Sequence, residues 1–283
     1  MKYLIAYLLG LVQGLSEFLP ISSSGHLMLI TTLTKNAVSE EMFGSFFTVM
    51  LHVATLAAVV VVYRKQIKEL IRWPLHKTVI LLIIATLPTV VFALILSAFD
   101  ALDDWLDAGN LLGLSFLVTS VLLFASDLLL QKKDRRRGID EMTWKDALTI
   151  GGMQAVGVLP GVSRSGSTIS GALFAGLDRR AAADFSFLLS IPAILGGMAL
   201  EFLKLIKAPE SLKLLGTFDF WLCLLPAMAI AAVTGYFAVR FMLQLIKKKS
   251  LRGFAIYTGV LGVFVLLCQL FGWFGFGFTK FGG

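Results

Sequence analysis

The chain has 283 residues, of which 57% are hydrophobic and only 15% are charged, and its mean hydropathy is +0.85. Soluble domains carry about 25% charged residues, so this composition excludes a soluble globular protein and a disordered chain. The net charge is +7, but the basic residues stand in short loops between apolar runs. That placement is typical of signals for membrane orientation, and we expect no nucleic-acid partner.

Long apolar runs recur along the chain and predict an all-α polytopic membrane protein. Six of these runs are long enough to cross a bilayer, and they cover residues 43–63, 78–98, 109–130, 184–203, 219–243 and 253–275. Lys and Arg gather in the loops 64–77, 131–146 and 246–252. We expect these three loops on the cytoplasmic side, because basic loops are retained there.

Two further apolar stretches, residues 3–34 and 147–177, are too long for one span and too short for two. Each is interrupted in its middle by Pro, Gly and Ser, residues that stop a helix or let the backbone turn. Each half then reaches the membrane midplane but not its far side. We therefore predict two re-entrant helix hairpins whose turns are enclosed by protein or line a cavity.

The two predicted hairpins mark an internal repeat. A shift that places Gln13 on Gln154 also places the segment 22–25 (SSSG) on the segment 163–166 (SRSG). Three spans follow each hairpin, so the second hairpin enters the membrane from the side opposite to the first. This arrangement predicts an inverted-topology repeat whose site lies where the two broken segments meet.

The repeat also sets the predicted domain organisation. We predict a single integral membrane domain over residues 1–283, divided into halves of about 1–140 and 141–283. Each half contains one re-entrant hairpin and three transmembrane helices.

The first hairpin carries a carboxylate, a histidine and several serines. Gln13 and Glu17 are spaced i, i+4 and share one face of a helix, and a carboxylate in an apolar hairpin indicates a functional site. Ser23 and His26 are close enough in sequence for His26 to activate Ser23 as a nucleophile. The alternatives are serines bonded to helix carbonyls and a buried histidine with satisfied hydrogen bonds. For His52, within a predicted span, packing or a supporting role is favoured over catalysis.

The second hairpin contains Arg164 among hydroxyl groups at the start of a predicted helix. A guanidinium, hydroxyls and free backbone N–H groups form a binding site for phosphate. The alternative for Arg164 is a structural ion pair with Glu17. If the two turns face each other, the site suits phosphoryl chemistry, and the missing P-loop motif disfavours a nucleotide triphosphatase. The predicted substrate-binding residues are Ser22, Ser24, Ser163, Arg164, Ser165, Gly166, Ser167 and Thr168.

These two motifs resemble those of the bacterial undecaprenyl-diphosphate phosphatase family, also called the bacitracin-resistance protein family. The first hairpin is similar to the family motif (E/Q)xxxE followed by PxSSxGH, here Gln13 to Glu17 and then Pro20 to His26. The second is similar to PGxSRSGxT, here Pro160 to Thr168. The order of the motifs and the pattern of spans match along the whole chain.

The resemblance implies hydrolysis of undecaprenyl diphosphate to undecaprenyl phosphate and inorganic phosphate, which recycles the carrier lipid for peptidoglycan synthesis and confers bacitracin resistance. It also implies a multi-pass protein of the bacterial cytoplasmic membrane, with its site open to the outer face and a divalent cation, Mg²⁺ or Ca²⁺. Some members have a second acid where this chain has Gln13, so Glu17 is the main expected metal ligand and Gln13 a weaker one. The sequence does not decide whether the protein forms a homodimer.

The expected catalytic residues are Glu17, Ser23, His26 and Arg164. The sequence does not choose between Ser23, His26 and water as the nucleophile, although a phospho-Ser23 intermediate with His26 as base is slightly favoured. A transporter of an anionic polyprenyl lipid is the alternative function, because inverted repeats with broken helices are typical of transporters.

Overall fold

Helices form the regular structure of the chain. The computed structural model describes residues 1–35, 43–132, 137–207, 215–248 and 250–278. Within these ranges the β-type pairing is one isolated bridge between Arg137 and Leu177. The predicted all-α architecture is therefore confirmed for the described residues.

Six helices of the described chain are long and apolar enough to cross a membrane, which confirms the predicted number of spans. They are α3 (Ser45–Val62), α5 (Lys77–Leu96), α7 (Leu112–Lys132), α10 (Arg179–Lys207), α12 (Phe218–Lys248) and α13 (Arg252–Phe271). The largest differences from prediction are five residues, at the start of α10, which begins before 184, and at the end of α12, which extends beyond 243. Charged residues in these terminal turns are helical without being apolar, so hydropathy does not reveal them.

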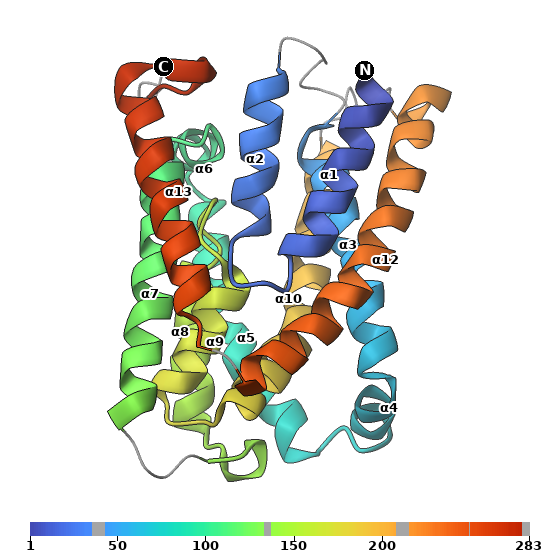
Figure 1. The fold of residues 1–283 in the computed structure, drawn as a ribbon. Helices are drawn as coiled ribbons and strands as arrows, with labels where there is room; N and C mark the ends of the chain where they lie inside the picture. The colour runs from blue at the N-terminus through green and yellow to red at the C-terminus, as the bar shows by residue number, and fades with distance from the viewer. Residues whose placement is uncertain (36–42, 133–136, 208–214, 249, 279–283) are drawn as a thin grey trace.

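Each predicted hairpin is a pair of short helices. The first pair is α1 (Lys2–Ser16) and α2 (Ser23–Thr34), and the second is α8 (Trp144–Val156) and α9 (Arg164–Phe174). The first pair begins and ends at the upper end of the molecule, whereas the second begins and ends at the lower end (Figure 1). The turns of both pairs lie inside the bundle. Their depth in a bilayer stays a prediction.

A serine caps the second helix of each pair in the same way. Ser22 accepts a hydrogen bond from the backbone N–H of Gly25 at 3.2 Å, and Ser163 accepts one from Gly166 at 3.0 Å. These bonds satisfy an N–H group that a helix start leaves free. The repeated SxxG pattern therefore fixes where α2 and α9 begin.

The first helix of each pair also packs through a glycine in the same way. A Cβ atom added at Gly10 would lie 2.3 Å from the carbonyl oxygen of Ala227 in α12, and one added at Gly151 would lie 2.3 Å from that of Ala85 in α5. Only glycine permits such close helix contact. Gly10 and Gly151 are related by the shift that relates Gln13 to Gln154, and each contact joins one half of the chain to the other.

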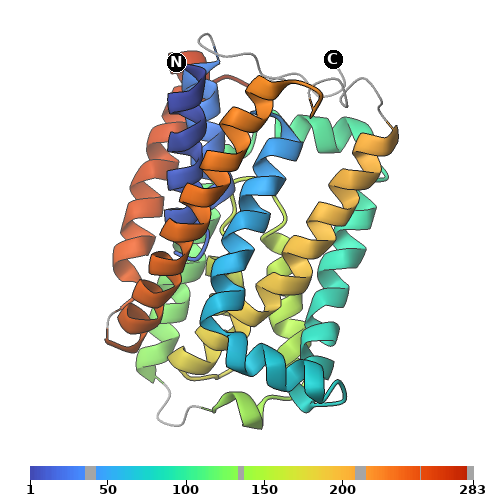
Figure 2. The ribbon, with the colours of Figure 1, turned by 90° about the vertical axis from the view of Figure 1, so that its right-hand side faces the viewer.

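On the side shown in Figure 2, α3 stands between α12 and α10, and α5 lies beyond α10. The largest core cluster of the described residues includes Phe18 from the first turn and Phe185 and Phe187 from α10, all of them fully buried. The turn of the first pair is thereby anchored to the centre of the bundle.

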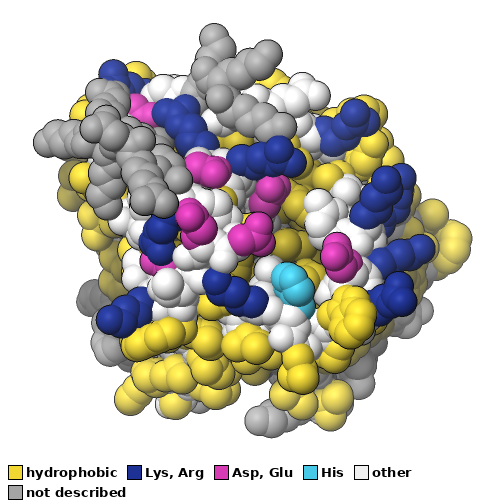
Figure 3. Space-filling view, turned by 90° about the horizontal axis from the view of Figure 1, so that it is seen from below, with side chains coloured by type: hydrophobic (Ala, Val, Ile, Leu, Met, Phe, Trp, Pro, Cys, Tyr) yellow, Lys and Arg dark blue, Asp and Glu magenta, His cyan; other side chains and the backbone are white. Residues whose placement is uncertain are grey.

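Short helices cover both ends. The predicted basic loop 64–77 contains α4 (Arg64–Arg72) at the lower end, and α6 (Asp100–Asp107) lies at the upper end (Figure 1). The 3₁₀ turns Ile139–Glu141 and Trp273–Gly275 complete the regular structure of the described chain. Lys and Arg side chains are spread over the lower face (Figure 3), where the expected cytoplasmic loops would lie. Residues 133–136 and 249 of those loops lie outside the described residues.

A buried carboxylate joins three helices near the lower end. Asp127 of α7 is 1% exposed; it receives hydrogen bonds from Arg179 at 3.2 Å and the Leu251 N–H at 3.3 Å, and an ion pair at 2.9 Å from Arg252. Replacing Asp127 with alanine leaves a buried N–H unpaired, which costs about 1–3 kcal/mol. We expect a lower thermal unfolding midpoint in detergent, with Asp104→Ala in exposed α6 as the control. Equal midpoints for the two variants would contradict this anchoring role.

Candidate active site

The turns of the two helix pairs meet in the interior of the bundle. Arg164, the first residue of α9, forms an ion pair with Glu17, which follows α1. Ser165 donates a hydrogen bond to the carbonyl oxygen of Leu19 at 3.0 Å, and the Gly161 N–H approaches the hydroxyl of Ser24 at 3.4 Å. Residues about 140 positions apart therefore form one site, as the predicted meeting of the two turns requires.

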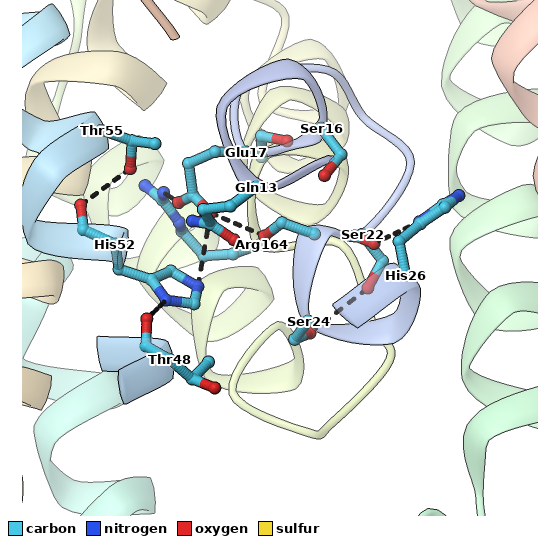
Figure 4. A network of polar contacts seen from close by, with 12 residues as sticks. Gln13, Ser16, Glu17, Ser22, Ser24, His26, Thr48, His52, Thr55 and Arg164 are labelled. Carbon is cyan, nitrogen blue, oxygen red and sulfur yellow. Dashed lines mark hydrogen bonds and ion pairs between the residues drawn. The ribbon is translucent and has the colours of Figure 1, made fainter. Parts of the chain in front are cut away.

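Glu17 is the centre of this polar network (Figure 4). Its side chain is buried, and one oxygen, Oε2, accepts hydrogen bonds from Ser23 at 2.6 Å and from the Gln13 amide at 2.9 Å. Its other oxygen, Oε1, pairs with Arg164. A carboxylate held by three partners in a low-dielectric interior is fixed in one orientation. This makes Glu17 a well-placed proton acceptor for Ser23.

His52 enters the site from α3. Its Nδ1 donates to the carbonyl oxygen of Thr48 at 2.8 Å, and its Nε2 lies 3.4 Å from Oε2 of Glu17. The sequence favours a packing or supporting role for His52; the structure places it beside Glu17, and its role stays a prediction. The signal in the sequence is a histidine inside an otherwise apolar span.

His26 lies away from Glu17 (Figure 4) and contacts Tyr257 of α13. Its Nδ1 donates to the carbonyl oxygen of Ser22 at 2.6 Å, and its Nε2 accepts a hydrogen bond from Tyr257 at 2.7 Å. Ser23 donates to Glu17 instead, so the Ser23–His26 pair that the sequence suggests is not formed. His26 closes the turn around Ser22, whose φ of 70° is unusual for a residue with a side chain.

The predicted phosphate-binding residues divide into two groups. Ser24, Ser163 and Arg164 line the same cavity as Glu17 and Ser23. The other group packs inside the protein: the Thr168 hydroxyl contacts that of Ser186 at 2.6 Å, and the buried Ser167 hydroxyl has no hydrogen-bond partner among the described residues. Ser22 caps α2, Gly166 donates its N–H to the cap of α9, and Ser165 donates a hydrogen bond from one turn to the other. Binding roles for this second group stay predictions.

The cavity has a volume of about 260 Å³ and is lined by both polar and apolar side chains. Its apolar wall is formed by Val49, Val158, Val162, Ala193, Ile194 and Met198. Thr89 and Gln154, which hydrogen bond to each other at 2.9 Å, line it as well. These two were not assigned to the site from the sequence, since a threonine within a span looks like ordinary helix packing. A molecule with an anionic head and an apolar tail fits such a cavity.

The residues around Glu17 also fit a hard divalent cation. The amide oxygen of Gln13 is buried and has no hydrogen-bond partner in the described chain, and it belongs to the side chain that contacts Glu17. A carboxylate and an amide oxygen are ligands that Mg²⁺ and Ca²⁺ accept. No group of three His, Cys, Asp or Glu residues is placed so that it could hold a metal ion in the part of the chain that the structure describes. Phosphate oxygens and water would therefore supply the remaining ligands.

His52 permits a test of how strictly Glu17 must be oriented. Replacing His52 with leucine removes a polar group that lies 3.4 Å from the carboxylate, whereas glutamine keeps a polar group there. We expect His52→Leu to lower the catalytic rate constant about tenfold or more, because small displacements of a catalytic group reduce rates strongly, and His52→Gln to restore part of it. Equal rate constants for the leucine variant and the wild type would contradict the positioning role.

Together the fold and this site define a class of protein: a multi-pass helical membrane protein with a polar cavity, lined by Glu17 and Arg164, between two broken helical segments. The chain belongs to the bacitracin resistance protein BacA family, whose model matches residues 6–264.

Relatives match over almost the whole chain. Undecaprenyl-diphosphatase 3 of Bacillus cereus is 41% identical over 274 residues, which cover 95% of this chain and 98% of the relative. An undecaprenyl-diphosphatase of Treponema denticola is 42% identical, covering 91% of this chain and 94% of the relative. One from Carboxydothermus hydrogenoformans is 37% identical over 95% of this chain and 98% of the relative.

Proposed function

We propose that this protein hydrolyses undecaprenyl diphosphate to undecaprenyl phosphate and inorganic phosphate. The observation that carries the proposal is the contact of Ser23, Glu17 and Arg164 inside one cavity with an apolar wall. The cavity offers the Arg164 guanidinium for the diphosphate, the Ser23 hydroxyl with Glu17 as its proton acceptor, and an apolar surface for the start of the prenyl chain. The names of the relatives describe the same reaction.

Binding begins with an exchange of partners at Arg164. Without substrate, its guanidinium neutralises Glu17. The diphosphate is a stronger acceptor for the bidentate fork of Arg164, and the backbone N–H groups at the start of α9 lie at the same place. Arg164 then stabilises the charge that moves from the terminal phosphoryl group to the bridging oxygen.

Ser23 is the proposed nucleophile. Its Oγ attacks the terminal phosphorus while its proton passes to Oε2 of Glu17, which lies 2.6 Å away. The bond between the terminal phosphorus and the bridging oxygen breaks, and undecaprenyl phosphate leaves. This assigns to Glu17 the role of base that the sequence suggested for His26.

Water completes the reaction. Its oxygen attacks the phosphorus of phospho-Ser23, and the bond to Oγ breaks. One water proton returns to Oγ, the other stays on the phosphate, and the proton on Glu17 passes to the product or to solvent. A divalent cation held by Glu17 and Gln13 would neutralise phosphate charge when bound.

The proposal extends to the place of the site in the cell. We propose that the protein lies in the bacterial cytoplasmic membrane and that the diphosphate enters from the outer face. This is supported by the position of the first helix pair. The start of α1 and the end of α2 lie at the end of the molecule opposite to the basic face (Figures 1 and 3). Removal of the lipid diphosphate would also deprive bacitracin of its target.

Phosphate release in detergent tests the proposed function. Detergent micelles provide no compartments, so a transporter without hydrolytic activity would release no phosphate there. We expect purified, folded protein to release phosphate from a long-chain polyprenyl diphosphate, with the rate reduced by EDTA and restored by Mg²⁺ or Ca²⁺. No release by folded protein at any cation concentration would contradict hydrolysis and favour transport of the lipid.

A further inference from the structure

A second cavity, with a basic lining, lies at the lower end of the bundle, away from Glu17 and Arg164. A cavity of about 380 Å³ opens where α3 ends, α4 begins and α12 passes. Its polar lining consists of Arg64, Lys65, Gln66, Tyr236 and Arg240, and no acidic residue of the described chain lines it. Three cations therefore surround one hollow.

Carboxylates of the described chain do not neutralise these three cations. Arg240 donates a hydrogen bond to the Tyr236 hydroxyl at 2.9 Å, with its guanidinium 5.5 Å from the centre of that ring. Arg64 reaches the carbonyl oxygen of Val61 at 3.4 Å. Among the described residues, none of the three cations forms an ion pair with a carboxylate. The Tyr236 contact holds Arg240 in place and leaves its remaining N–H groups for a ligand.

The surroundings of the cavity are apolar and exposed. Val61 belongs to its lining, and Val60, Phe237 and Phe241 on the adjoining turns of α3 and α12 are between 43% and 62% exposed. These side chains belong to helices long and apolar enough to cross a membrane, so lipid chains would cover them. Lys and Arg also gather on the face at this end (Figure 3).

From this arrangement we propose that the cavity binds the phosphodiester headgroup of an anionic phospholipid such as phosphatidylglycerol, with its acyl chains along Phe237 and Phe241. Basic pockets between transmembrane helices at the cytoplasmic surface recognise headgroups in this way. Inorganic phosphate is also an anion, but it would leave the exposed apolar side chains beside the cavity uncovered. The ligand is a structural lipid, and its binding does not depend on the proposed hydrolysis.

Native mass spectrometry of the full chain in detergent tests this site. We expect the wild type to retain one phosphatidylglycerol at least about tenfold more tightly than phosphatidylcholine, because each cation contributes about fivefold near an anionic headgroup. The variant K65Q/R240Q should lose this preference. The matched control K68Q/R72Q removes one Lys and one Arg from α4 outside the cavity and should keep it.

Further measurements distinguish a phospholipid from other anionic ligands and test whether the variants are folded. The thermal unfolding midpoint without added lipid should be the same for both variants. Competition by inorganic phosphate alone, or tighter binding of a polyprenyl phosphate than of phosphatidylglycerol, would overturn the assignment to a phospholipid. Equal loss of binding in K65Q/R240Q and K68Q/R72Q would overturn the site itself. Because the readout is bound lipid, absence of hydrolysis would leave the result unaffected.

Discussion

Replacing Arg164 with alanine is expected to lower the rate of phosphate release by at least about 100-fold. Removing one preorganised donor of charge stabilisation costs about 10²–10³ in rate in other enzymes, and among the described residues Arg164 is the only Lys or Arg that lines the cavity. The substitution also leaves Glu17 without its ion-pair partner. The measurement is steady-state phosphate release from a polyprenyl diphosphate in detergent.

Two further variants test whether the loss of rate is specific to the guanidinium of Arg164. Arg164→Lys keeps the charge but loses the bidentate fork, so we expect its rate to lie between those of the alanine variant and the wild type. Arg72→Ala makes the same chemical change in exposed α4 and should leave the rate unchanged. A folded Arg164→Ala protein that hydrolyses substrate at the wild-type rate would exclude the turn of the second hairpin as the catalytic site.

Replacing Ser23 with alanine is expected to lower the rate by at least about 1000-fold, because loss of an activated nucleophile removes the covalent route altogether. Ser23 is buried and donates to Glu17 at 2.6 Å. A second measurement is independent of the rate. Acid quenching of the wild type, with substrate labelled on its terminal phosphate, should show label on the peptide that contains Ser23.

Ser16 provides the matched control for Ser23. It is also buried and next to Glu17 in sequence, but its hydroxyl donates to the carbonyl oxygen of Val12 within α1. Ser16→Ala should retain the wild-type rate. If Ser23→Ala retained a substantial rate and the wild type carried no label, water activated by Glu17 would replace Ser23 as the nucleophile.

The two histidines show where sequence reasoning reaches its limit. Spacing placed His26 near Ser23, and motif resemblance added weight to a catalytic role. The structure bonds His26 to Ser22 and Tyr257, since the direction of a side chain at a helix start depends on the turn before it. His52 lies 35 residues from Glu17 in the chain and reaches it only through the packing of α3, which no local pattern specifies.

The helix pairs were predictable because their signals are strong and local. Pro, Gly and Ser interrupt two apolar stretches of nearly equal length, and the breaks are observed at residues 17–22 and 157–163. The ion pair of Glu17 with Arg164 was foreseen as an alternative because each is a charged group in an apolar setting. The contact of Thr89 with Gln154 was not, because it depends on how α5 packs against α8.

One structure determination would decide whether the two turns form the active site. The structure of the protein would be determined in complex with a methylene-bridged diphosphonate analogue of the polyprenyl diphosphate. This analogue cannot be hydrolysed. We predict the diphosphonate between Arg164 and the start of α9, the Glu17–Arg164 pair opened, and Ser23 Oγ facing the terminal phosphorus. A diphosphonate bound elsewhere in the protein, with the Glu17–Arg164 pair intact, would contradict the proposed site.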